Sequence, residues 1–316
     1  MAQAQAIGAH STASSLQRDV AAFRRHLRAA NLSPRTQGSY TEGIARLEAF
    51  LVARGMPQEI ASVRREHVEA FIADLLEHWS PATAHNRYAA CQQFFKWAVD
   101  EGLIRESPMA KMRPPKLPEV LVPVLSDAQL RRLLAAIDAD TSFRGRRDSA
   151  LVRVFMDTGA RLSEIANLRW TPGVPETNDL DLDERLVRVT GKGNRERLVV
   201  VGNKTVKALD RYSRLRDAST YHDLPWLWLG QKGRLTTSGV AQGLRDRGDA
   251  AGLVGLHPHQ LRHTYAHRSL AGGMQESDLM RLAGWRSPTM LRRYAASSAS
   301  ERAIAAAKRH STSDEL

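Results

Sequence analysis

A proline-rich segment near the middle of the chain limits the possible fold more than any other feature. Residues 105–123 read RESPMAKMRPPKLPEVLVP and contain five prolines. Proline has no amide hydrogen to donate and disfavours helical backbone at the residue before it, so this segment cannot be one continuous helix. The sequence therefore predicts an extended linker over residues 111–124 with a folded domain on each side, which suits a chain of 316 residues.

Before the linker, the sequence predicts a helical domain over residues 13–110, preceded by a flexible start at 1–12. Ser33-Pro34 and Ser80-Pro81 predict two helix starts, because serine caps free amides and proline at the first helical position loses no needed donor. Apolar residues recur every three or four positions, the spacing of one helix face. Four such stripes are marked by Val20, Phe23 and Leu27; by Tyr40, Ile44, Leu47 and Leu51; by Val68, Phe71, Ile72 and Leu75; and by Ala84, Tyr88, Cys91, Phe95 and Ala98.

After the linker, the sequence predicts a mixed domain over residues 125–297, opened by the capping-box pair Ser126 and Gln129. Two strand patterns, Leu186–Thr190 and Arg197–Val201, flank a Gly-Lys-Gly-Asn turn and predict a hairpin. The expected fold class is therefore mainly α with a small β-sheet. Helical patterns cover about residues 147–157, 203–216, 236–251, 259–271, 276–283 and 288–294, and Ser298 with Glu301 caps a last helix in a C-terminal helix and tail at 298–316.

The charge balance indicates a polyanionic partner. The chain has 46 Lys and Arg against 34 Asp and Glu, a formal charge of +12 and a pI near 10.3, although a basic surface kept for solubility is the alternative. No stretch approaches the roughly 20 apolar residues that span a bilayer, and the start lacks a signal-peptide pattern, so we expect a cytoplasmic protein with no membrane partner. Cys91 is the only cysteine, which excludes an internal disulfide and a cysteine-based zinc cage.

Two segments of the second domain carry residue types suited to phosphate chemistry. TGARLSEIANLRW places Arg161 after a glycine at the start of a short helix, where its planar fork can meet a phosphate. HPHQLRHTYAHRSL places His259 and Arg262 three residues apart, so a titratable ring and a permanent cation share a helix face. Taken singly, a solvated surface arginine and a capped helix end are the ordinary explanations.

Two further segments are equally weak alone. LAGWRSPTMLRRYAA has Trp285 nine residues before Tyr294, with a Ser-Pro helix start between them. GKGNRERLV has Lys192 at the hairpin tip and Arg195 and Arg197 on the following strand, where basic side chains can touch a phosphate backbone. Half-buried core aromatics and a solubilising lysine are the alternatives.

Together and in this order, the four segments resemble the tyrosine site-specific recombinases, the phage integrase family. The matching motifs are TGxRxSE, GKGxxxR, the HxLRHT box, and LxGW followed nine residues later by tyrosine. In the first domain, SPATAHNRYAACQQFFKWAVDEGLIRESPMAKMRPPK is similar to the end of the family's core-binding domain and its linker. The resemblance spans about residues 14–297 and implies a helical SAM-like core-binding domain followed by a mixed α/β catalytic domain.

The resemblance also implies a role for each matching residue. Arg161 and Arg262 would clamp the scissile phosphate, and Tyr294 would be the nucleophile. Lys192 would be the general acid for the leaving 5′ oxygen, and His259 would help to move the tyrosine proton. This fits elementary chemistry, because two guanidiniums stabilise charge that spreads over phosphate oxygens, and a tyrosine of pKa about 10 needs its proton removed.

Three more residues match supporting positions. Trp285 stands where many members have a second histidine, and it would donate its indole N–H to a phosphate oxygen. Glu164 fits an acidic supporting position and His263 a packing position. The phosphotyrosine keeps the energy of the broken bond, so neither ATP nor a metal is needed, and no cofactor is expected; the sequence has no P-loop and no carboxylate cluster for two metals.

The resemblance further implies that the partner is double-stranded DNA, bound by a homotetramer that joins two sites. Arg87 and Lys96 on basic helix faces, with Arg195 and Arg197, are candidate DNA-contacting residues. The last helix, 298–316, either packs on an adjacent protomer or folds back on its own domain. Other readings stay open: a type IB topoisomerase or telomere resolvase, a catalytically silent DNA-binding regulator, and a metal-dependent nuclease.

Overall fold

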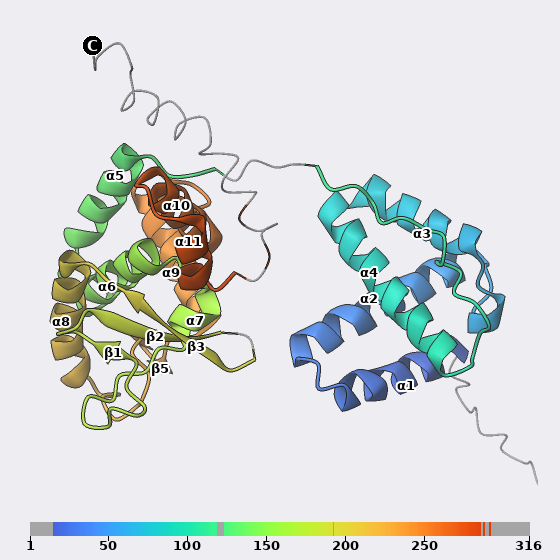
Figure 1. The fold of residues 1–316 in the computed structure, drawn as a ribbon, viewed down its shortest axis with the longest axis horizontal. Helices are drawn as coiled ribbons and strands as arrows, with labels where there is room; N and C mark the ends of the chain where they lie inside the picture. Colours follow the sequence, from blue (N-terminus) through green and yellow to red (C-terminus); the bar gives the residue numbers. More distant parts are fainter. Residues whose placement is uncertain (1–14, 119–122, 192, 286, 288–290, 292–316) are drawn as a thin grey trace, which may run out of the picture. The chain divides into compact units, whose positions relative to one another are not determined.

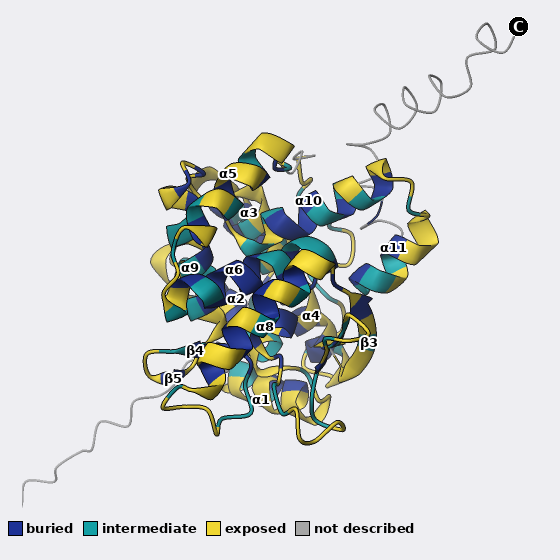
Figure 2. Ribbon diagram, turned by 90° about the vertical axis from the view of Figure 1, so that its left-hand side faces the viewer, coloured by how far each residue is buried: buried dark blue, intermediate teal, exposed yellow. Residues whose placement is uncertain are grey.

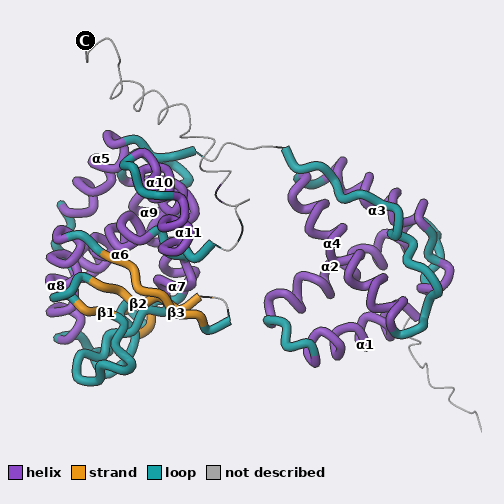
Figure 3. The backbone as a smooth tube through the Cα atoms, viewed as in Figure 1, coloured by secondary structure: helices purple, strands orange, loops and turns teal. Residues whose placement is uncertain are grey.

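The computed structural model describes residues 15–118, 123–191, 193–285, 287 and 291. Contacts within the chain divide it into two compact units, Met1–Val120 and Leu121–Leu316, both drawn in Figure 1. Helices predominate among the described residues, and all of the strands found there belong to the second unit (Figure 3). The prediction of a mainly α chain with a small β-sheet is therefore confirmed. No helix in this part of the chain is long and apolar enough to cross a membrane.

The N-terminal unit is helical throughout its described residues. Ser33 and Ser80 accept hydrogen bonds from the backbone N–H groups of Thr36 and Thr83, each at 3.2 Å, and so cap two helices that begin with proline. Both predicted Ser-Pro helix starts are confirmed. The elements are α1 (Ser15–Ala29), α2 (Pro34–Ala53), the short 3-10 helix η1 (Ile60–Ser62), α3 (Arg65–His78) and α4 (Pro81–Asp100).

Helix α4 packs against α2 and α3 and carries the aromatic centre of this unit. Phe94 is fully buried, and its ring centroid lies 5.3 Å from that of Phe23, 5.5 Å from Phe95 and 5.6 Å from Trp97. Cys91 is buried in the same core, and burial raises the pKa of its thiol to about 12. The core of this unit is thus built from the apolar stripes that the sequence shows.

The C-terminal unit combines helices with a small sheet. Its helix α6 contacts α8 and α10, while α11 contacts α10 and the strand β3. These contacts bring helices and a strand that are far apart in the sequence into one region. The elements are α5 (Asp127–Asp138), α6 (Phe143–Thr158), α7 (Leu162–Ala166), β1 (Leu180–Asp181), β2 (Leu186–Gly191), β3 (Arg195–Val200), α8 (Asn203–Asp217), β4 (Leu229–Gly230), β5 (Gly233–Arg234), α9 (Thr237–Ala250), α10 (Pro258–Ala271) and α11 (Glu276–Ala283).

The predicted hairpin is formed by β2 and β3. The two strands pair antiparallel, from Leu186 opposite Val200 to Gly191 opposite Arg195, and β1 pairs with the other edge of β2. Asn194, in the turn, has a φ of 55°, a left-handed conformation that asparagine tolerates. The two-residue strands β1, β4 and β5 were not expected, because so short a segment shows no alternation of apolar and polar residues.

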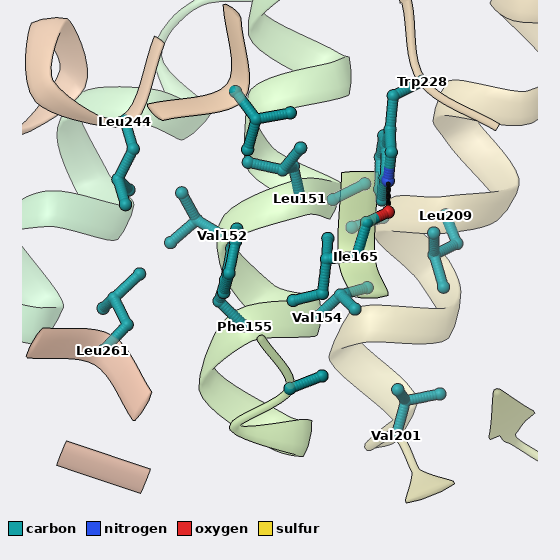
Figure 4. Packing of buried hydrophobic residues seen from close by; sticks show 14 of the residues in the cluster. Leu151, Val152, Val154, Phe155, Ile165, Val201, Leu209, Trp228, Leu244 and Leu261 are labelled. Atoms are coloured by element: carbon teal, nitrogen blue, oxygen red, sulfur yellow. Dashed lines mark hydrogen bonds between the residues drawn. The ribbon is translucent and has the colours of Figure 1, made fainter. Parts of the chain in front are cut away.

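Helix α6 carries the central packing of the C-terminal unit. Leu151, Val152 and Phe155 lie among side chains from several other helices (Figure 4). The indole N–H of Trp228 donates to the backbone carbonyl of Ile165 at 2.8 Å, the dashed line in Figure 4. Since Ile165 belongs to α7, this bond fixes that short helix to the core, which is dark blue on the inner helix faces in Figure 2.

Candidate active site

Arg161 stands at the junction between α6 and α7, as its motif predicts. Gly159 ends α6 in the left-handed conformation (φ 55°), and a Cβ there would meet the Tyr265 ring at 2.2 Å, so backbone and space both require glycine. Arg161 is the N-cap residue of α7. Its Nη2 donates to the carbonyl of Gly284 at 3.1 Å, and 43% of its side chain remains exposed. The guanidinium is therefore oriented yet accessible to a ligand.

Glu164 anchors Arg161 from the inside of the molecule. The carboxylate accepts from the Arg161 backbone N–H and Nη1, both at 2.8 Å, and from Arg197 Nη1 and Nη2 at 3.0 and 2.7 Å, while its side chain is 1% exposed. Burial is the largest influence and favours protonation, but the hydrogen bonds and charges of the two arginines outweigh it and lower the pKa of Glu164 to about 2. The carboxylate is thus ionised at neutral pH.

Arg262 lies on α10 and is buried, with 2% of the residue exposed. Its Nη1 donates to the Gly159 carbonyl at 2.5 Å and its Nη2 to the Ala283 carbonyl at 2.7 Å. The guanidinium carbon lies 5.3 Å from the ring centre of Trp285, within the range of a cation–π contact. Arg262 therefore joins the end of α6 to the end of α11.

Three arginines converge on consecutive carbonyls at the C-terminal end of α11. Arg197 Nε donates to Leu282 at 2.7 Å, Arg262 to Ala283, and Arg161 to Gly284. Carbonyls at this end of a helix carry partial negative charge, so they stabilise cations there. These carbonyl acceptors were not predicted from the sequence. The glycine after a helical pattern was a readable sign of a helix end, and Gly284 does cap α11 in the left-handed conformation, with a φ of 65°.

Two histidines of α10 lie beside the arginines. The ring centroids of His259 and His263 are 4.8 Å apart at an interplanar angle of 85°, and His263 is buried. His259 is exposed as a whole residue, but packing removes part of the water around its ring. That partial desolvation, followed by repulsion from Arg262, His257 and Arg161, lowers the pKa of His259 below its ordinary 6.5. A neutral imidazole is therefore available at neutral pH.

The hairpin reaches this cluster through the turn end of its strands. Lys192 lies outside the described residues, but its neighbour Gly191 is close to Glu164: a Cβ on that glycine would lie 3.0 Å from Glu164 Oε1. Arg195 is exposed on β3. Arg197, a candidate DNA contact, places its guanidinium against Glu164 and the Leu282 carbonyl, with 14% of its side chain exposed.

Of the two aromatic residues of the predicted site, the structure describes Trp285 but not Tyr294. Trp285 is 6% exposed and packs with Ala266, Leu270 and Leu279 of α10 and α11. Tyr294 and the helical pattern of 288–294 lie outside the described residues, apart from the buried Leu291, and so does the segment 298–316. The structure therefore brings together Arg161, Glu164, His259, Arg262, His263 and Trp285.

The two candidate DNA contacts of the N-terminal unit differ in their surroundings. Arg87 donates to the Ser39 carbonyl at 3.2 Å and to Glu42 at 2.5 Å, so its charge is paired. Lys96 is exposed on α4. Within the described part of the chain, no group of three or more His, Cys, Asp or Glu side chains is arranged to hold a metal ion.

The arrangement can bind and polarise a phosphate diester. Two guanidiniums, one accessible and one buried, meet at neighbouring carbonyls, and a neutral imidazole lies on the same helix as the buried one. Guanidinium forks suit phosphate oxygens, and an imidazole near its pKa exchanges protons readily. Two guanidiniums beside a proton-exchanging imidazole suit an enzyme that transfers a phosphodiester bond.

Comparisons with known proteins agree with this class. Two family models match the chain: the phage integrase family over residues 123–301, and the phage integrase N-terminal SAM-like domain over residues 20–105. Tyrosine recombinase XerC of Xanthomonas campestris pv. campestris is 33% identical over 261 residues, which cover 78% of this chain and 74% of the relative. XerC of Myxococcus xanthus is 30% identical over 280 residues, covering 86% and 90%.

Solved structures share the fold. A XerH site-specific recombinase bound to a palindromic difH substrate has a TM-score of 0.71 at 17% identity, covering 91% of this chain and 83% of that one. The Tn1549 transposon integrase in complex with a circular intermediate DNA has a TM-score of 0.70 at 20% identity, covering 89% and 95%. The chain belongs to the phage integrase family. It is a tyrosine recombinase, a DNA strand-transferring enzyme of site-specific recombination, and the resemblance noted in its sequence is confirmed.

Proposed function

We propose that this recombinase cleaves and rejoins duplex DNA through a covalent 3′-phosphotyrosine on Tyr294, acting as a homotetramer on two sites. One observation carries the proposal: Arg161 and Arg262, over a hundred residues apart in sequence, donate to the adjacent carbonyls of Gly284 and Ala283. Their guanidiniums are thereby held at the start of the segment that leads to Tyr294. A crystal structure of a lambda integrase tetramer bound to a Holliday junction shares the fold and supports the proposed tetramer.

Each step has a residue of suitable chemistry. The Tyr294 oxygen attacks phosphorus and breaks the bond to the 5′ oxygen; its proton passes to His259, and Lys192 protonates the leaving oxygen. Arg161 and Arg262 stabilise the negative charge that spreads over the non-bridging oxygens. Rejoining is the same reaction in reverse, with a 5′ hydroxyl as the attacking group.

Other side chains support these groups. Trp285 donates its indole N–H to a phosphate oxygen, Glu164 aims Arg161, and His263 packs behind His259. Since the phosphotyrosine conserves the energy of the phosphodiester, the reaction needs neither a metal nor ATP.

DNA binding is proposed to use both domains. Residues 13–110 form the core-binding domain, 111–124 the linker and 125–297 the catalytic domain. Arg87, Lys96 and Arg195 contact the phosphate backbone, which makes affinity fall as salt rises. The segment 298–316 packs on an adjacent protomer and links the subunits of the tetramer.

The substitution Tyr294→Phe tests the nucleophile. We expect DNA affinity close to that of the unchanged protein and complete loss of the covalent adduct on a nicked suicide substrate, because only the attacking oxygen is removed. DNA affinity is measured by gel shift and the adduct by its retarded migration under denaturing conditions. An adduct that persists in Tyr294→Phe would show another nucleophile, and an unchanged protein that forms no adduct would indicate a silent DNA-binding regulator.

A further inference from the structure

We propose that Arg197 is a positioning residue for strand transfer: it sets the orientation of the Arg161 guanidinium through Glu164, and it fixes the end of α11 that receives Arg161 and Arg262. The inference rests on the proposed function, because it assumes that these two arginines hold the scissile phosphate. Arg197 itself would touch neither the phosphate nor Tyr294.

The backbone of Arg197 is fixed by the sheet. Arg197 pairs with Val189 in the β2–β3 ladder, so its Cα has a defined place. Side chains alternate along a strand, and Arg197 therefore shares a face with Val199, which is buried in the core. The side chain thus points toward the interior of the unit, and β3 and α11 are in contact, as Figure 2 shows at one edge of the unit.

The Arg197 guanidinium contacts two parts of the site at once. Nη1 and Nη2 donate to the two Glu164 oxygens in a bidentate pair, and Nε donates to Leu282. One planar group therefore ties α7 to the last turn of α11. Gly284 packs on it so closely that a Cβ would lie 3.1 Å from the Arg197 Cζ and 3.1 Å from its Nη1, so the guanidinium fits a space with little slack.

Charge makes Arg197 necessary for Arg161. Glu164 accepts four hydrogen bonds, two of them from Arg197. Without Arg197, a carboxylate with 1% exposure would keep only the bonds from Arg161 and would be far less favourable in its ionised form. A protonated or displaced Glu164 would release Arg161 Nη1, and a shift of about 1 Å at a catalytic group can reduce a rate on the order of 100-fold.

A substrate without charge on the scissile linkage distinguishes positioning from general structural damage. In a methylphosphonate, one non-bridging oxygen is replaced by a methyl group, so the guanidiniums have less negative charge to stabilise. We expect Arg197→Gln to reduce cleavage of the phosphodiester on the order of 10- to 100-fold relative to the unchanged protein. On the methylphosphonate, the cleavage rate of Arg197→Gln divided by that of the unchanged protein should move toward one. The same is expected for Arg161→Ala.

Arg188 provides a matched control on the neighbouring strand β2. It pairs with Asp179 at 3.2 Å and donates to the carbonyls of Glu176 and Asn178 at 2.9 and 2.6 Å, so it is also a half-buried hairpin arginine in a network, but one that does not reach the site. Arg188→Gln should lower thermal stability and change cleavage of both substrates by the same factor. Arg197→Lys keeps a cation beside Glu164 and should recover part of the activity.

Three outcomes decide the matter. The positioning role is overturned if Arg197→Gln reduces the cleavage rate equally on both substrates while the deficit of Arg161→Ala is smaller on the methylphosphonate. That result leaves the proposed function standing. Loss of DNA affinity in proportion to cleavage overturns the positioning role as well and makes Arg197 a DNA contact. If Arg161→Ala shows no difference between the substrates, the clamp assigned under the proposed function fails first. Thermal unfolding of each variant shows that the measured proteins are folded.

Discussion

The two units of the molecule bury different kinds of side chain. In the N-terminal unit, the buried residues among those described are apolar or aromatic, with one cysteine and one glycine. In the described part of the C-terminal unit, eleven polar or charged residues are buried: Arg147, Asp148, Ser149, Thr158, Glu164, Thr205, Ser213, Arg216, Arg262, His263 and Thr264. The first unit is held by packing of apolar area, while the second also holds charges whose hydrogen bonds must be satisfied.

Buried charge alone does not mark the active site. Arg147 donates to Asp148 and to the Leu229 carbonyl, and Arg247 joins Asp148 to Asp140. Arg216 donates to the carbonyls of a nearby loop. These networks connect helices and loops of the C-terminal unit to one another. Nor does a buried carboxylate with a partly exposed cation mark the site, because Asp148 also pairs with Arg144, whose side chain is 54% exposed. The site differs because its three arginines donate to the consecutive carbonyls of Leu282, Ala283 and Gly284.

The largest effect should come from the apolar unit. Phe94→Ala removes a fully buried ring with three aromatic neighbours and should lower the free energy of unfolding of the N-terminal unit by about 3–5 kcal/mol. Hydrogen exchange followed by mass spectrometry measures this region by region. We expect faster exchange within residues 15–118 and little change within 123–285. Equal acceleration in both regions would show that the two units unfold together and would remove the contrast drawn here.

Acid should have a smaller effect on stability, and this effect should arise in the C-terminal unit, where charged groups are buried. The folded pKa of Glu164, about 2, lies below its ordinary 4.5, so ionisation stabilises the folded state. This contribution is complete above pH 5 to 6 and is lost as pH falls from 4.5 toward 2; the difference between the two values corresponds to about 3 kcal/mol.

The control for the acid experiment is Glu164→Gln, which cannot ionise. Urea unfolding at several pH values should show the unchanged protein more stable than the variant at pH 6, with the gap narrowing toward pH 2. A gap that stays constant over this range would mean that the carboxylate is not stabilised by Arg161 and Arg197. It would also weaken the case that Arg197 orients the site.

Local sequence signals predicted the fold well and the site in part. The starts of α2 and α4 were readable because a Ser-Pro pair acts within one turn. Helix α6 was expected from residue 147 but begins at Phe143, capped by Ser142, since the basic residues of its first turns hide the apolar stripe. Arg197 was a candidate DNA contact because it follows the basic turn of the hairpin. No local pattern could show that its guanidinium reaches Leu282, which lies 85 residues away.

Several site residues could be predicted from the sequence for a different reason. Arg161, His259 and Arg262 lie in short motifs, each with a glycine or proline that sets a helix end nearby. What the sequence could not supply is the shared acceptor, the end of α11, because a carbonyl carries no residue-type signature. The same holds for Glu164, whose two-sided pairing depends on the hairpin and α7 meeting in space.

The smallest expected effect is a shift in the pH midpoint of cleavage, set by His259 of the C-terminal unit. Partial desolvation and the charges of Arg262, His257 and Arg161 lower the pKa of His259, so the neutral ring predominates at lower pH than usual. If His259 accepts the Tyr294 proton, single-turnover cleavage should fall as pH decreases, with a midpoint below 6.5. His257→Asn removes one of these charges but keeps a side chain able to cap α10, where His257 now accepts from Gln260 N–H at 3.2 Å. Its midpoint should therefore move up toward 6.5, whereas a midpoint above 6.5 in the unchanged protein would mean that the site favours the imidazolium and that His259 acts as a donor.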